Sequence, residues 1–173
     1  MKKSYYLSLL LLFPCSLLAQ ELKIFNDTSF SFTAKYPVSW TNKIKEGKKV
    51  FFTSPADGEN DHFYENINVS VTKNAAFGND INVKDAIPSV LKGLNNTIDK
   101  FSLESEIYFK WNNNEACELI YTGQPKNSDL QIKITQWFCF SNERLFTATY
   151  TALASNIIYT APALKILQSI SFR

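Results

Sequence analysis

The acidic loop that could hold a cation contains Asp57, Glu59, Asp61 and His62. Alternating carboxylates can present several oxygen atoms to one side of a loop, and calcium accepts several oxygen ligands at once. The loop lacks the spacing of a known calcium-binding loop and has no bidentate glutamate at the required offset. A solvated acidic turn explains the same residues equally well. We therefore keep the four residues as candidate ligands and assign no metal or other cofactor.

Any catalysis with a histidine base would have to use His62, because it is the only histidine in the chain. Serine and cysteine nucleophiles of the triad type both need a histidine base. His62 lies in a polar loop, and the sequence contains no Gly-x-Ser-x-Gly elbow and no glycine-rich phosphate loop. Three or four zinc ligands cannot be assembled from so few histidines and cysteines. The sequence therefore predicts no catalytic residue and a protein that is not an enzyme.

Two cysteines outside the N-terminal segment, Cys117 and Cys139, lie in stretches that are typical of strands. An oxidising compartment would permit a disulfide between them. Two buried thiols that act as small apolar side chains are the other interpretation. The apolar neighbours of Cys139 would make its thiol inert, since burial raises a thiol pKa. The sequence leaves both alternatives open.

The first nineteen residues have the layout of a secretory signal peptide. Met1 is followed by Lys2 and Lys3, an apolar run extends from Tyr5 to Leu18, and Ala19 supplies a small residue for cleavage. The apolar run is shorter than the roughly 20 residues that span a bilayer. We expect a signal peptide at 1–19 and one domain at 20–173. The mature chain is expected in the periplasm or outside the cell, with no transmembrane anchor.

The charge of the mature chain argues against a nucleic-acid partner. The full chain has 18 Lys and Arg against 16 Asp and Glu, and Lys2 and Lys3 leave with the signal. A mature chain close to neutral has no basic patch of the size that nucleic acids or anionic membranes attract.

Period-2 alternation and turn residues predict a mainly β domain with two helices. The helix over 86–99 should be capped by Asp85 with Pro88 in its first turn, and the helix over 161–169 by Thr160. Strands are expected at 30–36, 49–53, 67–71, 102–110, 116–121, 130–140 and 145–152. Short polar connections between the later strands favour antiparallel neighbours.

Aromatic side chains are frequent, and the three tryptophans are Trp40, Trp111 and Trp137. They could line a surface that binds sugars or peptides. Aromatic residues near strand ends more often pack in the core and at its rim. Packing is the interpretation that the sequence favours.

Three segments together resemble one known family. They are the stretch from Phe32 to Trp40 with its Tyr-Pro and Trp, the Glu-Asn-Ile-Asn-Val strand within 63–71, and the closing Ser-Ile-Ser-Phe at 169–172. In this order they are similar to PsbP-like domains, a family that includes the extrinsic PsbP subunit of photosystem II and bacterial exported proteins such as DcrB. The resemblance implies an α+β fold, an α/β/α sandwich with a central antiparallel sheet flanked by helices. It implies a binding or assembly module and carries no catalytic residue to this chain.

The combined expectation is an exported, non-enzymatic binding or assembly module of the bacterial envelope, whose partner is an envelope or secreted protein. The alternative is a metal-assisted hydrolase or a cation-binding protein that uses the 57–62 loop.

Overall fold

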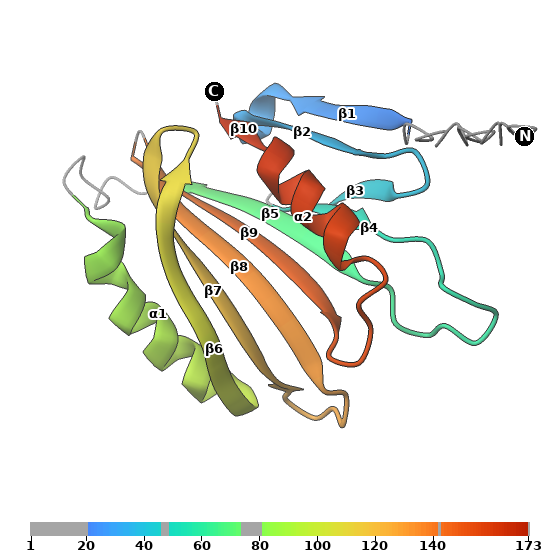
Figure 1. Ribbon diagram of the computed structural model, residues 1–173. Helices are drawn as coiled ribbons and strands as arrows, with labels where there is room; N and C mark the ends of the chain where they lie inside the picture. Colours follow the sequence, from blue (N-terminus) through green and yellow to red (C-terminus); the bar gives the residue numbers. More distant parts are fainter. Residues whose placement is uncertain (1–20, 46–48, 74–80, 142, 173) are drawn as a thin grey trace, which may run out of the picture.

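A large antiparallel sheet forms the centre of the computed structural model, which describes residues 21–45, 49–73, 81–141 and 143–172 (Figure 1). Each strand pairs with its neighbours in antiparallel register. Short turns suffice to connect such strands, as the polar connections in the sequence predict. The seven strands, in spatial order, are β3 (Thr41–Lys45), β4 (Lys49–Thr53), β5 (Asn66–Lys73), β9 (Arg144–Leu153), β8 (Ile132–Ser141), β7 (Asn114–Pro125) and β6 (Ile98–Trp111).

The two faces of this sheet are covered by different elements (Figure 1). Helix α1 (Val83–Thr97) packs against β6, β7 and β8 on one face. Helix α2 (Thr160–Ser169) lies on the other face, together with a small sheet of β1 (Leu22–Asp27), β2 (Phe32–Pro37) and β10 (Ser171–Phe172). A short 3-10 helix (Thr28–Phe30) connects β1 to β2. The expected α+β sandwich with a central antiparallel sheet and flanking helices is therefore confirmed.

Alternation along the strands divides the buried side chains into two cores. In β5, Ile67 and Val69 point toward α2 and are fully buried. They pair with Tyr150 and Ala148 of β9, which belong to the same core. We call this the α2-side core. The α1-side core contains Cys117, Leu119, Tyr121 and Phe138 with Val83 and Ile87 of α1. A one-residue shift in any central strand would exchange these two sets.

The C-terminal end of α2 is tied to both sheets by polar side chains. The Lys35 amide donates to Ser169 Oγ at 2.8 Å, and this hydroxyl donates to the Lys35 carbonyl at 3.0 Å. Asn112 Nδ2 donates to the Ile170 carbonyl at 2.8 Å. These bonds fix the position of α2 relative to β2 and to the turn after β6.

Most expected strands are present, and β4 has the bounds that the sequence predicts. The strand expected from Phe30 begins instead at Phe32, because the preceding 3-10 turn ends in Ser31 with a positive φ of 57°. Three described strands were not predicted, namely β1, β3 and the two-residue β10. β1 and β3 are edge strands with mostly exposed side chains, so they lack the buried alternation that identifies the central strands.

Both helix caps differ from the expectation. Asn82 Oδ1 accepts the Lys84 amide at 2.9 Å, so α1 begins at Val83 and Asp85 lies in its first turn. Pro88 consequently lies beyond the first turn, inside the helix. α2 begins at Thr160, and its N-terminal flank Tyr159 makes no side-chain capping bond. No described helix combines the length and the hydropathy that crossing a membrane would require.

Candidate functional site

The acidic loop is organised by bonds within the protein and not around a shared centre. Asp61 accepts the backbone amides of Asp57 and Phe63 at 3.0 and 2.9 Å, an arrangement that closes the turn. Asp57 Oδ2 accepts a hydrogen bond from Asn156 Nδ2 at 2.8 Å. Glu59 and His62 are exposed. Within the described residues, no three His, Cys, Asp or Glu side chains are grouped as metal ligands would be.

In this arrangement the acidic side chains bond within the protein, and cation binding by the 57–62 loop stays a hypothesis. The loop borders an open depression of about 540 Å³, which Leu130 and Leu153 also line. Its carboxylates are used for turn formation and for the contact with Asn156.

A buried carboxylate that the sequence analysis did not single out lies next to this loop. Glu65 is fully buried. Its Oε1 accepts a hydrogen bond from Asn156 Nδ2 at 2.9 Å, and its Oε2 accepts one from Ser54 Oγ at 3.4 Å. Burial raises the pKa of Glu65, and the nearby negative charges of Asp61 and Asp57 raise it further. Strand periodicity could have identified Glu65 as buried, because it precedes Ile67 by two residues and residues two apart in a strand share a face.

The two cysteines occupy opposite faces of the sheet. Cys139 of β8 lies directly across from Ala116 of β7, so these two side chains point to the same face of the sheet. Cys117 follows Ala116 in β7, and adjacent residues of a strand point to opposite faces. Cys139 accordingly belongs to the α2-side core and Cys117 to the α1-side core. Both are free and buried. Since the side chains diverge across the sheet, the possible disulfide between Cys117 and Cys139 is not formed, and the buried-thiol interpretation describes the structure.

Burial also makes both thiols unreactive. It raises the pKa of Cys117 to about 11 and that of Cys139 to about 12. At neutral pH, almost no thiolate is present to act as a nucleophile or a soft metal ligand.

A thiol count tests this arrangement. The purified chain from residue 20, denatured without reductant, should give two free thiols per molecule in a colorimetric assay. The native protein should react much more slowly, because opening of the sheet must precede the reaction. A count of zero free thiols in the denatured chain would contradict the assignment.

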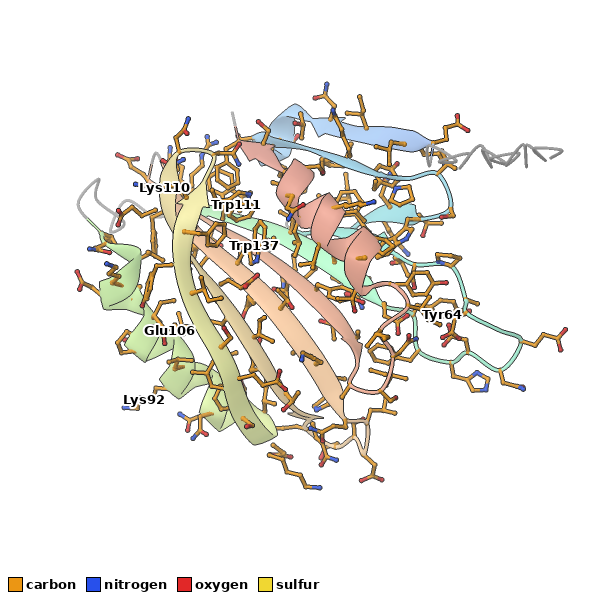
Figure 2. The ribbon with its side chains drawn as sticks, in the orientation of Figure 1. Tyr64, Lys92, Glu106, Lys110, Trp111 and Trp137 are labelled. Atoms are coloured by element: carbon orange, nitrogen blue, oxygen red, sulfur yellow. The ribbon has the colours of Figure 1, made fainter. Side chains whose placement is uncertain are left out.

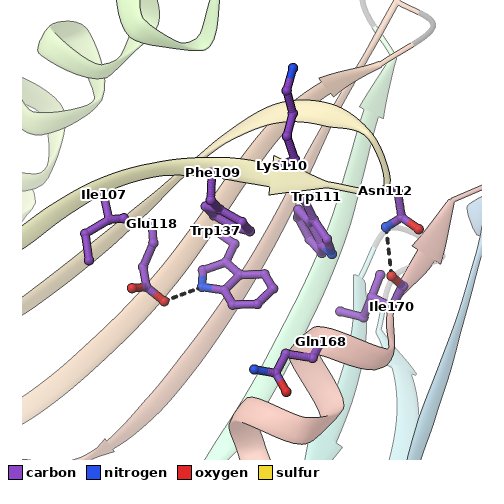
Figure 3. Close-up of a pocket in the computed structure, with 9 residues that line it drawn as sticks. All are labelled: Ile107, Phe109, Lys110, Trp111, Asn112, Glu118, Trp137, Gln168 and Ile170. Carbon is purple, nitrogen blue, oxygen red and sulfur yellow. Dashed lines mark hydrogen bonds between the residues drawn. The ribbon is translucent and has the colours of Figure 1, made fainter.

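A second depression is an aromatic groove of about 410 Å³ beside the C-terminal end of α2 (Figure 3). Strands β6, β7 and β8 form its floor, and α2 with the residue after it forms one wall. Figure 3 shows the rings of Phe109, Trp111 and Trp137 gathered above α2. The complete lining consists of Ile107, Phe109, Lys110, Trp111, Asn112, Glu118, Trp137, Gln168 and Ile170.

The three rings hold one another at edge-on angles. Trp137 packs against Phe109 with centroids 4.8 Å apart and against Trp111 at 5.3 Å. Trp111 also packs against Phe172 at 4.7 Å. Such edge-to-face contacts are favourable beyond the apolar area that they bury. The aromatic part of the groove is therefore a preformed surface.

The polar groups of the groove differ in their partners. Trp137 Nε1 donates to Glu118 Oε2 at 2.6 Å, which fixes the half-buried carboxylate at the groove wall (Figure 3). The Trp111 side chain is buried, and its Nε1 makes no hydrogen bond with any described residue. A buried N–H without a partner costs free energy that an acceptor would recover. The groove thus offers apolar contact area, while the Trp111 N–H itself is buried below its surface.

The packing interpretation of these tryptophans is confirmed, and a sugar- or peptide-binding surface stays a hypothesis. Trp111 and Trp137 are buried core residues, as packing predicts, and their ring edges also line the groove. Trp40 is fully enclosed and packs edge-on against Tyr159 at 5.9 Å. The sequence could not identify which tryptophans meet at a surface, because Trp111 and Trp137 are brought together by pairing of β6, β7 and β8.

Comparison with known proteins identifies the fold. No protein-family model and no curated protein matches the chain. Solved structures do match it. A protein of unknown function from Pseudomonas aeruginosa aligns with a TM-score of 0.62 at 18% identity, over 88% of this chain and 97% of the other.

Two further matches agree with this result. Cyanobacterial PsbP from Synechocystis sp. PCC 6803 aligns with a TM-score of 0.61 at 14% identity, over 94% of this chain and 99% of the other. LpqN of Mycobacterium tuberculosis, a protein involved in cell envelope biogenesis, aligns with a TM-score of 0.55 at 13% identity, over 88% and 86%. At these identities the similarity defines a shared fold, and it is the fold that the sequence resemblance implied.

Proposed function

We propose that this chain, which has a PsbP-like fold, is an exported, non-enzymatic binding module whose aromatic groove contacts a protein of the envelope or the surrounding medium. The observation that carries the proposal is the preformed aromatic groove, which is bordered by the exposed Ile107. The layout of residues 1–19 supports export. The role of LpqN in envelope biogenesis makes an envelope setting the natural one to test.

The groove specifies what a partner segment should present. An apolar or aromatic side chain would cover Phe109 and Ile107, the latter being 50% exposed. Aromatic residues that are rigid and partly buried are the side chains that most often dominate binding energy. The partner is therefore expected to insert one apolar side chain.

Ile107 offers a test that spares the core. The wild-type chain from residue 20 and its Ile107→Asp variant are immobilised and used to capture proteins from the native envelope and culture medium, with identification by mass spectrometry. We expect one stoichiometric partner whose affinity falls at least about tenfold in Ile107→Asp, since a hot-spot side chain contributes more than about 1.4 kcal/mol.

Ile44→Asp is the matched control. Ile44 is 42% exposed and lies on β3, at the opposite edge of the same sheet. It introduces the same charge at a comparable exposure, so it should leave capture unchanged. Equal loss in both variants would reject the groove as the binding surface. Absence of any partner for the wild-type chain would reject the module itself.

A further inference from the structure

Strand β6 forms one edge of the large sheet, and three large apolar or aromatic side chains are exposed on it among charged ones. Among the described residues it pairs with β7 alone, so its outer edge carries unpaired backbone groups. Leu103, Ile107 and Tyr108 expose 38%, 50% and 38% of their surface. A long edge strand with exposed apolar side chains is a template for pairing with another strand.

Only the second half of β6 is regular enough to pair. Its register with β7 shifts between Asp99 and Ser102 and again between Leu103 and Ser105. Such irregularities bend a strand and interrupt its hydrogen-bonding pattern. From Ser105 to Trp111 the register with β7 is unbroken. This segment, which we call the regular edge, is the part of β6 that can accept a further strand.

The two faces of the regular edge carry different chemistry. Ile107 and Phe109 line the aromatic groove. Glu106 and Tyr108 lie opposite Leu119 and Cys117 of the α1-side core, so they point to the α1 side of the sheet. Lys110 follows Tyr108 by two residues, so it lies on the same face of the strand as Glu106 and Tyr108. Figure 2 shows Glu106 and Lys110 along β6, with Trp111 and Trp137 toward α2.

The charges on the α1 side are symmetric in position and opposite in sign about Tyr108. Glu106 precedes it by two residues and accepts its hydroxyl hydrogen at 2.6 Å. Lys110 follows it by two residues and forms a 3.3 Å ion pair with Glu115. Both members of that pair are more than half exposed, so Lys110 remains open to a second carboxylate. Lys84 Nζ lies 5.3 Å from the Tyr108 ring centroid.

We propose that two copies of this chain associate edge to edge through their regular edges, antiparallel and centred on Tyr108. In this register, Glu106 of one copy lies opposite Lys110 of the other, and the contact occurs twice. Ile107 lies opposite Phe109 of the other copy on the groove face. Cross-strand pairs of opposite charge and of apolar side chains each stabilise an antiparallel ladder. The two sheets would become one continuous sheet.

Other symmetric registers within the regular edge are less favourable. Residues that lie opposite each other in the joined sheet must point to the same face, so their numbers must both be odd or both be even. The two-fold axis must therefore pass between the two copies of one residue. An axis at Glu106 or at Lys110 places like charges opposite each other. An axis at Ile107 or Phe109 leaves Glu106 or Lys110 facing Tyr108. Only the axis at Tyr108 pairs both charges within this segment.

Charge exchange at Glu106 and Lys110 tests the proposal; Lys110 also borders the groove, and Glu106 does not. We expect the chain from residue 20 to dimerise in analytical ultracentrifugation, and more weakly as salt increases. Glu106→Lys and Lys110→Glu should each raise the dimer dissociation constant at least about tenfold, because each creates two like-charge pairs. Mixing the two variants should restore a heterodimer, in which every Lys or Glu at 106 faces the opposite charge at 110.

Lys43→Glu on β3 is the matched control, since it makes the same charge change at the other edge of the sheet. It should leave dimerisation unchanged. A wild-type chain that stays monomeric up to about 1 mM would overturn the proposal, because the proposed interface should have a dimer dissociation constant below this concentration. So would failure of the mixed variants to recover. Because Ile107 belongs both to the groove and to the dimer contact, Glu106→Lys separates the two proposals: Glu106 does not line the groove, so this variant should lose dimerisation and keep partner capture.

Discussion

Replacing Asn156 by alanine is expected to lower the free energy of unfolding by about 1.5–3 kcal/mol at neutral pH. Asn156 Nδ2 donates to the fully buried Glu65 at 2.9 Å and to the exposed Asp57 at 2.8 Å. Hydrogen bonds to buried charged groups are the stronger ones, and loss of the Asn156 donor leaves Glu65 with only the longer bond from Ser54 Oγ among its side-chain partners. The contact with exposed Asp57 should add little. Urea unfolding of the two proteins measures the difference.

The effect should depend on pH in a defined direction. Burial raises the pKa of Glu65 above its unfolded value, so the folded state holds this proton more tightly than the unfolded state does. Stability from this group is therefore complete below the unfolded pKa and decreases as the pH rises through the folded pKa. Asn156→Ala removes a donor to the charged form, so its cost should be largest at neutral pH and should shrink as Glu65 becomes protonated.

Glu65→Gln is the control that isolates the charge. Glutamine has nearly the same shape and keeps one carbonyl oxygen to accept the Asn156 bond. In this background the cost of Asn156→Ala should fall to about 0.5–1.5 kcal/mol, as for a neutral hydrogen bond. A cost that is the same in both backgrounds and at every pH would assign Asn156 to another role. Its Oδ1 also accepts the Ile158 amide at 3.0 Å, which would then explain the result.

Gly123→Ala is expected to destabilise the fold by about 1–3 kcal/mol through overpacking. A Cβ at Gly123 would lie 2.3 Å from Ile98 Cγ2 and 3.0 Å from the Asp99 carbonyl oxygen. The second contact involves backbone, so the first residues of β6 would have to shift. This is where the register between β6 and β7 becomes irregular, and the missing side chain accommodates that close approach.

Gly93→Ala supplies the opposite expectation within the same chain. Gly93 lies in α1, and a Cβ there would have no atom within 4 Å. Alanine should stabilise the helix by about 0.5–1 kcal/mol, because it reduces the conformational freedom of the unfolded chain. Both variants are measured by urea unfolding. Equal stabilities of Gly123→Ala and the wild type would show that β6 adjusts at no cost.

Sequence patterns determined those parts of the fold that depend on local periodicity. The alternation around Ile67 and Val69 predicted a strand with one buried face, and the pattern along 49–53 predicted β4 with its bounds. The helical stripe in α1 was predicted from the same principle. These patterns are local because a strand or helix must present one face to the core. The closing segment at 169–172 belongs to the same fold and is tied to β2 by Ser169.

The helix starts and the edge strands were predicted poorly for physical reasons. Asn82 and Asp85 are both acceptable caps by residue type, and only the backbone bond from Lys84 decides between them. β1 and β3 bury little, so their sequences carry no clear alternation. A strand at an edge is defined by its partner more than by its own side chains.

The sequence alone determined the helical stripe, the central strands, the acidic turn and the scarcity of catalytic side chains. Tertiary structure decided which of those side chains meet. Strand pairing placed Cys117 and Cys139 on opposite faces, brought Trp111 and Trp137 to one groove, and enclosed Glu65 beside Asn156. Contacts between residues distant in the chain depend on register and packing across many strands, and no local pattern of residue types encodes them.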